Sequence, residues 1–101
     1  MFQFDSTLRM LSNKYRRNIM YVVTEAERDY INYNDVTEEL VENGFIDKSD
    51  EEKFEIQMRN RHLPLIEETG YIDHDERSDT IHYIEDEELE MLLETLKTFE
   101  D

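Results

Sequence analysis

The segment that most constrains the fold is residues 58–72, MRNRHLPLIEETGYI. Its residues Leu63, Ile66 and Thr69 recur at helical spacing, and Gly70 follows them. Glycine marks a helix C-terminus because it readily adopts the left-handed conformation that ends many helices. An aromatic and an aliphatic residue come next and indicate the start of a strand. The segment therefore predicts a helix that ends near Gly70 and leads directly into a short β element.

The length and composition of the chain limit the classes of protein that it fits. With 101 residues there is room for one domain with a modest core. The chain has no cysteine, which excludes disulfides and thiolate zinc sites. No run approaches the roughly 18 apolar residues that a membrane-spanning helix needs, and no signal-peptide pattern opens the chain. We therefore expect a cytoplasmic protein with no membrane association.

The charge of the chain is strongly acidic, with 27 Asp and Glu against 11 Lys and Arg, a net charge of −16. Two interpretations compete: an acidic tail or nucleic-acid mimic, and adaptation to a salt-rich cytoplasm, where dense surface carboxylates keep proteins soluble. The acids are spread along the chain between periodic apolar residues, which favours salt adaptation. Residues 1–33 carry five bases and four acids, whereas residues 85–101 carry eight acids and one lysine. If DNA is the partner, the less acidic front of the chain faces it.

Capping residues and apolar spacing predict the elements that precede residue 58. Ser49-x-x-Glu52 is a capping box, which predicts a helix over about residues 50–69. Before residue 49, polar residues that can cap helices and the Asn-Gly pair at 43–44 predict where further helices begin and end. The expected earlier elements are a helix over residues 5–11, a helix from Ser12 or Asn13, a β-prone patch at 30–33, and a helix from Asn34 or Asp35 to Gly44.

The helix over residues 50–69 has two chemically different faces. On a helical wheel the inner face groups Phe54, Met58, His62 and Ile66, with Leu63 at its flank. The outer face carries amide and cationic side chains. Asn and Gln side chains pair with adenine edges and Arg with guanine, so this face has the chemistry of a major-groove reader. The alternative is an ordinary solvated face. The residues of the outer face are Lys53, Gln57, Asn60 and Arg61.

Pro64 interrupts this helix in the sequence. It has no N–H to donate and its ring crowds the carbonyl of Asn60. We therefore expect a kink or a break near Leu63, on the outward side of the helix.

A hairpin follows the helix. Strands are expected over residues 71–75 and 80–84, joined by a polar turn. Arg77 lies at the tip, where it could reach a phosphate or a minor groove. It stands among Asp75, Glu76 and Asp79, so a solvated turn is an equal alternative.

The last segment is an amphipathic helix with acids on its polar side. About 15 residues form a marginal helix alone, so its apolar stripe must pack either on its own core or on a second chain. Regulators that read DNA usually dimerise, and we favour a homodimer through this helix. The chain is then divided into a DNA-binding domain at 1–84 and a dimerisation helix at 85–101. The expected interface residues are Leu89, Leu92, Leu93, Leu96 and Phe99.

Two segments carry a resemblance to a known group of proteins. Residues 11–23, LSNKYRRNIMYVV, are similar to a pattern of LSN, paired arginines and an aliphatic helix. Residues 62–73, HLPLIEETGYID, are similar to HLP, acidic residues, a small residue with glycine, and an aliphatic strand. Both patterns resemble small haloarchaeal regulator-like domains of poorly defined function, in the arsenical-repressor-like branch of the winged helix-turn-helix superfamily. The resemblance covers about residues 8–84. It implies a haloarchaeal or haloarchaeal-virus origin and transcriptional regulation, and no known ligand.

The sequence therefore predicts a mainly α fold with a small β-hairpin, a winged helix-turn-helix, acting on double-stranded DNA as a homodimeric transcriptional regulator. The alternative is an acidic winged-helix module that has lost DNA binding and contacts another protein. Convergence of the cations on one surface favours DNA, and neutralisation by Glu51, Glu52 and Glu55 favours the alternative. The candidate DNA-binding residues are Lys53, Gln57, Arg59, Asn60, Arg61, Arg77, Arg16 and Arg17.

Other kinds of site have little support in the sequence. Metal sensors of the wider superfamily use Cys and His ligands, and the three histidines here have no tight ligand spacing. His62 fits a helix face better than a ligand set, and a site at Asp73, His74 and Asp75 is the weaker alternative. No Ser-His-acid arrangement, glycine-rich phosphate loop or isolated carboxylate pair stands out. We expect no metal, no cofactor, no small-molecule ligand and no enzymatic activity.

Overall fold

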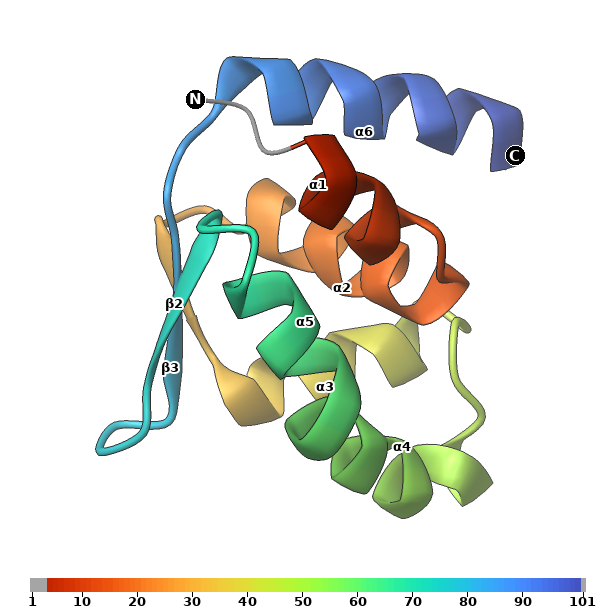
Figure 1. Cartoon of the computed structure of the whole chain (residues 1–101). Coiled ribbons are helices and arrows are strands. Elements are labelled where there is room, and N and C mark those ends of the chain that lie inside the picture. Colours follow the sequence, from red (N-terminus) through yellow and green to blue (C-terminus); the bar gives the residue numbers. More distant parts are fainter. Residues whose placement is uncertain (1–3, 101) are drawn as a thin grey trace.

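The computed structural model describes residues 4–100 and shows helices first, then a hairpin and a final helix (Figure 1). A 3-10 turn precedes α4, and a π-helical turn joins α4 to α5. The elements are α1 (Phe4–Leu11), α2 (Lys14–Glu25), β1 (Tyr30–Asn32), α3 (Tyr33–Glu42), the 3-10 turn (Lys48–Asp50), α4 (Glu51–Gln57), the π turn (Met58–His62), α5 (Leu63–Glu67), β2 (Ile72–Asp75), β3 (Thr80–Tyr83) and α6 (Glu87–Glu100).

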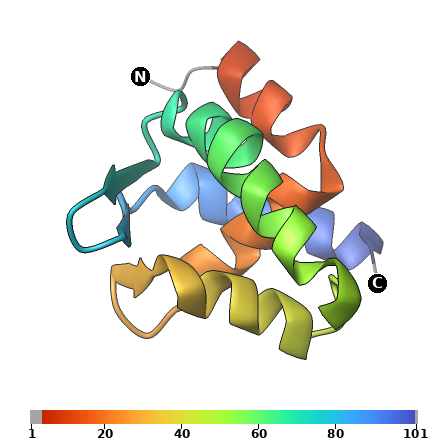
Figure 2. The same ribbon diagram turned by 90° about the horizontal axis from the view of Figure 1, so that it is seen from below.

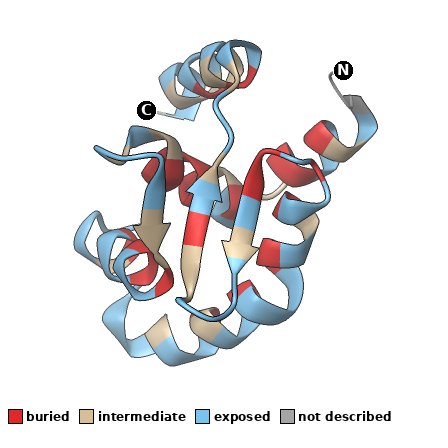
Figure 3. Cartoon of the chain, turned by 90° about the vertical axis from the view of Figure 1, so that its left-hand side faces the viewer, coloured by how far each residue is buried: buried red, intermediate tan, exposed pale blue. Residues whose placement is uncertain are grey.

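The strands form one antiparallel sheet in the order β1-β3-β2 (Figure 3). Strands β2 and β3 form the expected hairpin, with Asp75 opposite Thr80. The β-prone patch that precedes α3 becomes a third strand, because β1 pairs with β3 and sets Ile31 opposite Ile81. The fold is therefore mainly helical with a small sheet, as expected. Helices α3 and α4–α5 form a helix-turn-helix, and the β2–β3 hairpin is its wing.

Side-chain caps set the starts of α2, α3 and α6, and at α6 the carboxylate of Asp86 accepts the backbone N–H of Leu89. Asn13 Oδ1 accepts hydrogen bonds from the backbone N–H groups of Tyr15 and Arg16 and so begins α2. Asn32 caps α3, which begins at Tyr33, slightly earlier than predicted. The predicted capping box at Ser49 is wrong: a 3-10 turn occupies this position, and no side-chain cap bond forms at the start of α4. The helix begins at Glu51 without it.

A π-helical turn explains how the long helix accommodates both Pro64 and its apolar residues. Leu63 N–H bonds to the carbonyl of Met58, five residues back, and Pro64 follows within the first turn of α5. Apolar residues spaced by four drift about 40° per step around an α-helix. A π turn takes more residues per turn, which reduces the drift and keeps His62 and Ile66 buried with Met58. In place of the expected kink or break near Leu63, the helix widens locally into a π-helical turn. Figure 2 shows α4 and α5 as one continuous helix.

Helix α6 packs on α2 and completes the core of the same chain (Figure 1). Leu89 and Leu93, predicted at a dimer interface, are 0% and 3% exposed within the monomer, and Leu92 and Leu96 pack against the core at its edge. These positions follow the alternative, in which the helix packs on its own core. Among the predicted interface residues Phe99 alone is strongly exposed, at 83%. None of the helices in residues 4–100 has the length and apolar character needed to cross a bilayer.

Candidate nucleic-acid interface

The outer face of α4–α5 presents a compact set of polar and cationic side chains. Lys53, Gln57, Asn60 and Arg61 are all exposed, as the helical wheel predicts. Ile56 lies among them on this face and is 58% exposed. Between residues 53 and 66 three cations accompany one acid, Glu55, whereas the whole chain carries a net charge of −16. This stretch of the helix-turn-helix is therefore locally positive in an acidic protein.

Arg59 belongs to the same helix but is held against the wing. Its guanidinium bonds to Asp79 with an Nη2–Oδ2 distance of 2.7 Å and stacks over the Tyr33 ring at 3.9 Å from the centroid. Asp79 also bonds to His74 Nε2 at 2.9 Å, and its carbonyl accepts the Tyr33 backbone N–H at 2.8 Å. The four side chains, Arg59, Tyr33, Asp79 and His74, form a brace that ties the long helix and α3 to the wing.

The electrostatics of this brace agree with its geometry. The hydrogen bond to Asp79 raises the pKa of Arg59, and the same bond holds the pKa of Asp79 below its usual range. Burial raises the pKa of Tyr33, although the Arg59 charge opposes this shift. Both charges of the pair are therefore fixed at neutral pH, and Arg59 positions the wing while remaining partly open to solvent, with 43% of its side chain exposed.

Arg16 is the candidate whose position differs most from the prediction. It is 4% exposed and donates to the carbonyls of Met10 and Arg9 at 3.1 and 2.9 Å. Its Nη1 also lies 3.3 Å from Nδ1 of His62, behind the inner face of the long helix. Buried arginine is tolerated when its donors are satisfied in this way. Arg16 thus links α1, α2 and the π turn, and it offers no cation to the outer face.

His62 occupies the core beneath the outer face. It is 3% exposed and stacks on Phe54 with ring centroids 6.0 Å apart. Burial, followed by the charges of Arg16 and Arg61, lowers the pKa of His62. The ring is therefore neutral at pH 7, and it can accept a hydrogen bond from Arg16.

The other two predicted cations lie apart from the helix. Arg17 bonds to Glu100 of α6 at 2.7 Å and to the carbonyl of Leu11 at 2.7 Å, so it joins the last turn of α6 to α2. Arg77 is exposed at the tip of the wing, where its backbone N–H bonds to Asp75. The predicted set therefore separates into an outer face of the helix, a wing residue, and three arginines with structural contacts, Arg16, Arg17 and Arg59.

Sequence reasoning missed two features of this region. Ile56 was not assigned to a face, although its position three residues after Lys53 and four before Asn60 carries that signal. The brace partners Tyr33 and Asp79 are 20 or more residues from Arg59, and no local pattern joins them. Asp79 has φ of +54°, a conformation that aspartate tolerates better than most residues.

The possible metal site at Asp73, His74 and Asp75 has no matching geometry. His74 bonds to Asp79 through its Nε2, and Asp75 caps the turn through the N–H of Arg77. Across residues 4–100, no group of three or more His, Asp or Glu side chains is placed to hold a metal ion.

Comparison with known proteins places the chain in a family. A family model described as a domain of unknown function (DUF7344) matches residues 8–82, which is most of the chain, and the chain belongs to this family. No match was found among curated proteins or among solved structures.

Proposed function

We propose that this member of the DUF7344 family is a sequence-specific, DNA-binding transcriptional regulator that acts as a homodimer. The observation that carries the proposal is the outer face of α4–α5. It is the second helix of a helix-turn-helix, and its residues 56–61 include two cations, two amides and no acid. Helices in this position enter the major groove in proteins that use the motif.

The side chains of this face match the edges of base pairs. Gln57 and Asn60 offer the amide geometry that pairs with adenine, and Arg61 the bidentate donor geometry that pairs with guanine. Ile56 can contact the methyl group of thymine. Lys53, one turn earlier, is suited to a backbone phosphate. Recognition would therefore depend on base contacts more than on charge.

The overall charge of the chain agrees with this emphasis on base contacts. A protein with few exposed cations neutralises few phosphates, so its binding gains little from counterion release and loses little in concentrated salt. We propose that the acidic surface reflects a salt-rich, haloarchaeal cytoplasm. Such a surface would repel DNA less there, because the Debye length falls to about 3 Å at 1 M salt.

Dimerisation is proposed through the outer face of α6. Met91 and Phe99 on this helix are 69% and 83% exposed, whereas the leucines of its inner face fill the core. Dimeric readers of this kind place their two recognition helices in successive major grooves, about 34 Å apart.

The test is selection from a pool of random duplexes by the purified protein, at about 0.2 M and about 2 M KCl. Enrichment of a sequence, ideally with two half-sites, is the expected result, and no enrichment at either salt would overturn the proposal. Asn60→Ala and Arg61→Ala should each weaken binding to the enriched duplex about 5- to 150-fold, since a good base contact is worth about 1–3 kcal/mol. Arg9→Ala is the matched control for Arg61→Ala, because this arginine of α1 is exposed and its loss changes the net charge by the same amount.

A further inference from the structure

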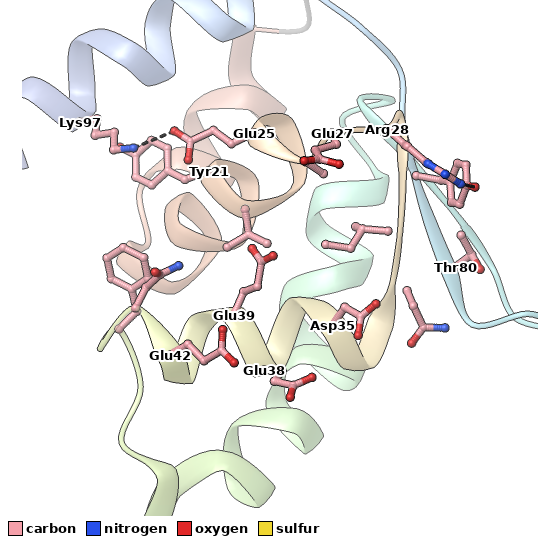
Figure 4. Close-up of a pocket in the computed structure, with 17 residues that line it drawn as sticks. Tyr21, Glu25, Glu27, Arg28, Asp35, Glu38, Glu39, Glu42, Thr80 and Lys97 are labelled. Carbon is pink, nitrogen blue, oxygen red and sulfur yellow. Dashed lines mark hydrogen bonds and ion pairs between the residues drawn. The ribbon is translucent and has the colours of Figure 1, made fainter.

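A wide groove lies between α2, β1 and α3 (Figure 4). Its volume is about 1050 Å³, and no residue of α4, the π turn or α5 lines it. The groove is therefore distinct from the outer face of the long helix. In Figure 4 it lies above α3, whereas α4 lies below α3.

The groove has apolar side chains on its surface. Val22 and Ala26 from the end of α2, Ile31 from β1, and Phe45 after α3 line it. Tyr30, at its β1 end, is 43% exposed and Phe45 is 36% exposed. Large apolar side chains left open in a concave surface are typical of protein-binding sites.

The walls of the groove are acidic. Glu25 and Glu27 come from the α2 side, and Asp35 and Glu39 point in from α3 (Figure 4). Two cations also line it: Lys97 pairs with Glu25 at 2.7 Å, and Arg28 keeps its charge while it bonds to the neutral hydroxyl of Tyr30 at 2.6 Å. Glu27, Asp35 and Glu39 form no ion pair with any residue in 4–100, so nothing in that part of the chain neutralises their charges. The lining acids are Glu25, Glu27, Asp35, Glu38, Glu39 and Glu42.

We propose that this groove binds a segment of another protein that carries arginine or lysine together with apolar side chains. Charge complementarity selects the occupant: six carboxylates against two cations give the lining a net charge of −4, which attracts a cationic segment, and the apolar residues between them bind its aliphatic side chains. The same carboxylates repel the phosphates of a nucleic acid. The proposal does not depend on DNA binding, and it adds a second surface through which the protein contacts a partner.

The probe for the test is a fluorescein-labelled twelve-residue peptide of alternating arginine and leucine, titrated with the full chain at about 0.2 M KCl. One control peptide has citrulline in place of arginine, which keeps the shape and removes the charge. A second has serine in place of leucine. We expect saturable binding of the arginine–leucine peptide, and at least about 10-fold weaker binding of both controls, because neither matches both the walls and the apolar surface.

A pair of charge-matched variants then locates the site. The first combines Glu27→Gln, Asp35→Asn and Glu39→Gln in the groove. The second combines Asp73→Asn, Glu85→Gln and Glu88→Gln, which are exposed and lie outside it. Exposed ion pairs are individually weak, so loss of three should weaken peptide binding about 10-fold in the first variant, with less than about 2-fold change in the second.

Several outcomes would overturn the proposal. Equal weakening by both triple variants would show attraction by the total charge alone. Failure of the native chain to bind the arginine–leucine peptide, or equal binding of the arginine–serine peptide, would remove the groove as a docking site. Complete displacement of the peptide by spermidine at equal charge concentration would have the same consequence. Retention of peptide binding in Arg61→Ala would separate this surface from the DNA-binding face.

Discussion

Helices α4–α5 and α6 have similar inner faces and opposite outer faces. Both bury an apolar stripe in one core, with Ile66 and Leu89 each 0% exposed. The outer face of α4–α5 carries amides and cations around Ile56, whereas that of α6 carries acids around Met91 and Phe99. The inner stripes hold the fold together, and the outer faces determine what each helix is able to contact. Apolar periodicity alone therefore identifies a buried face without identifying what covers it.

The largest expected effect comes from the inner faces. Leu89→Ala and Ile66→Ala should each lower the free energy of unfolding by about 2–5 kcal/mol, because truncation of a buried side chain leaves a cavity. Met91→Ala and Ile56→Ala, on the outer faces of the same helices, should change it by less than about 0.5 kcal/mol. Urea denaturation monitored by circular dichroism measures all four variants. Equal losses of stability from the inner and the outer truncations would contradict the distinction between the two faces of these helices.

The next effect depends on pH and on His62. Burial lowers the pKa of His62 in the folded chain, so the unfolded chain takes up this proton first as the pH falls. The free energy of unfolding should therefore fall below about pH 6.5, by at most about 1.4 kcal/mol per pH unit for this one proton.

In His62→Gln, which keeps an acceptor for Arg16, the loss of stability between pH 7.5 and pH 5.5 should be smaller than in the native chain. Urea denaturation at the two pH values measures it. His82→Asn, at an exposed position of β3, is the control. If His82→Asn flattens the dependence as much as His62→Gln does, the buried ring is not its source.

A smaller effect is expected from the brace between the long helix and the wing. Asp79→Asn removes the charge that pairs with Arg59 and keeps a residue that tolerates positive φ. The expected loss is about 0.5–1 kcal/mol at pH 7, since both partners are partly exposed.

Because the pKa of Asp79 is lowered in the fold, its contribution is present above about pH 4 and disappears as the pH falls through the folded pKa. The difference in unfolding free energy between native and Asp79→Asn chains should narrow accordingly. Asp73→Asn on β2 is the control and should leave stability unchanged. A difference that persists at low pH would assign the effect to packing.

The smallest expected effect on stability comes from Phe99. Phe99→Ser should change the free energy of unfolding by less than about 0.5 kcal/mol and should shift the proposed dimer towards monomer. Sedimentation velocity over a range of protein concentrations measures the shift. Leu8→Ser, which alters a half-exposed residue of α1, is the comparison. A shift in Leu8→Ser alone would move the interface from α6 to α1.

Local patterns in the sequence were sufficient for much of the fold. The stop at Gly70 and the wing strands depend on neighbouring residues, and the sequence predicted them. The cap of α2 is Asn13, one of the two residues that the sequence offered for it. Helical spacing also predicted which side chains of the long helix face the core and which face solvent. Burial of Phe54, Met58, His62 and Ile66 is confirmed, as is the exposure of Lys53, Gln57, Asn60 and Arg61.

The features that sequence reasoning missed depend on distant contacts. Arg16 reads as a surface cation, yet its donors are satisfied by two carbonyls and by His62, 46 residues away. The pairing of β1 with β3 and the brace at Asp79 also join separate parts of the chain. The dimer interface predicted for α6 included Leu89 and Leu93, which are buried in the monomer core instead. An amphipathic stripe fits either a monomer core or a second copy, so the sequence could not decide between them.

The π turn has a consequence for insertions and deletions during evolution. Its five residues, Met58–His62, keep the helix before and after it in phase, so each residue removed or added there would rotate α5 by about 100°. Leu63 and Ile66 would leave the core and the wing would change direction. Substitutions on the outer face can alter base preference one position at a time, whereas a change of length within the turn would disrupt the fold.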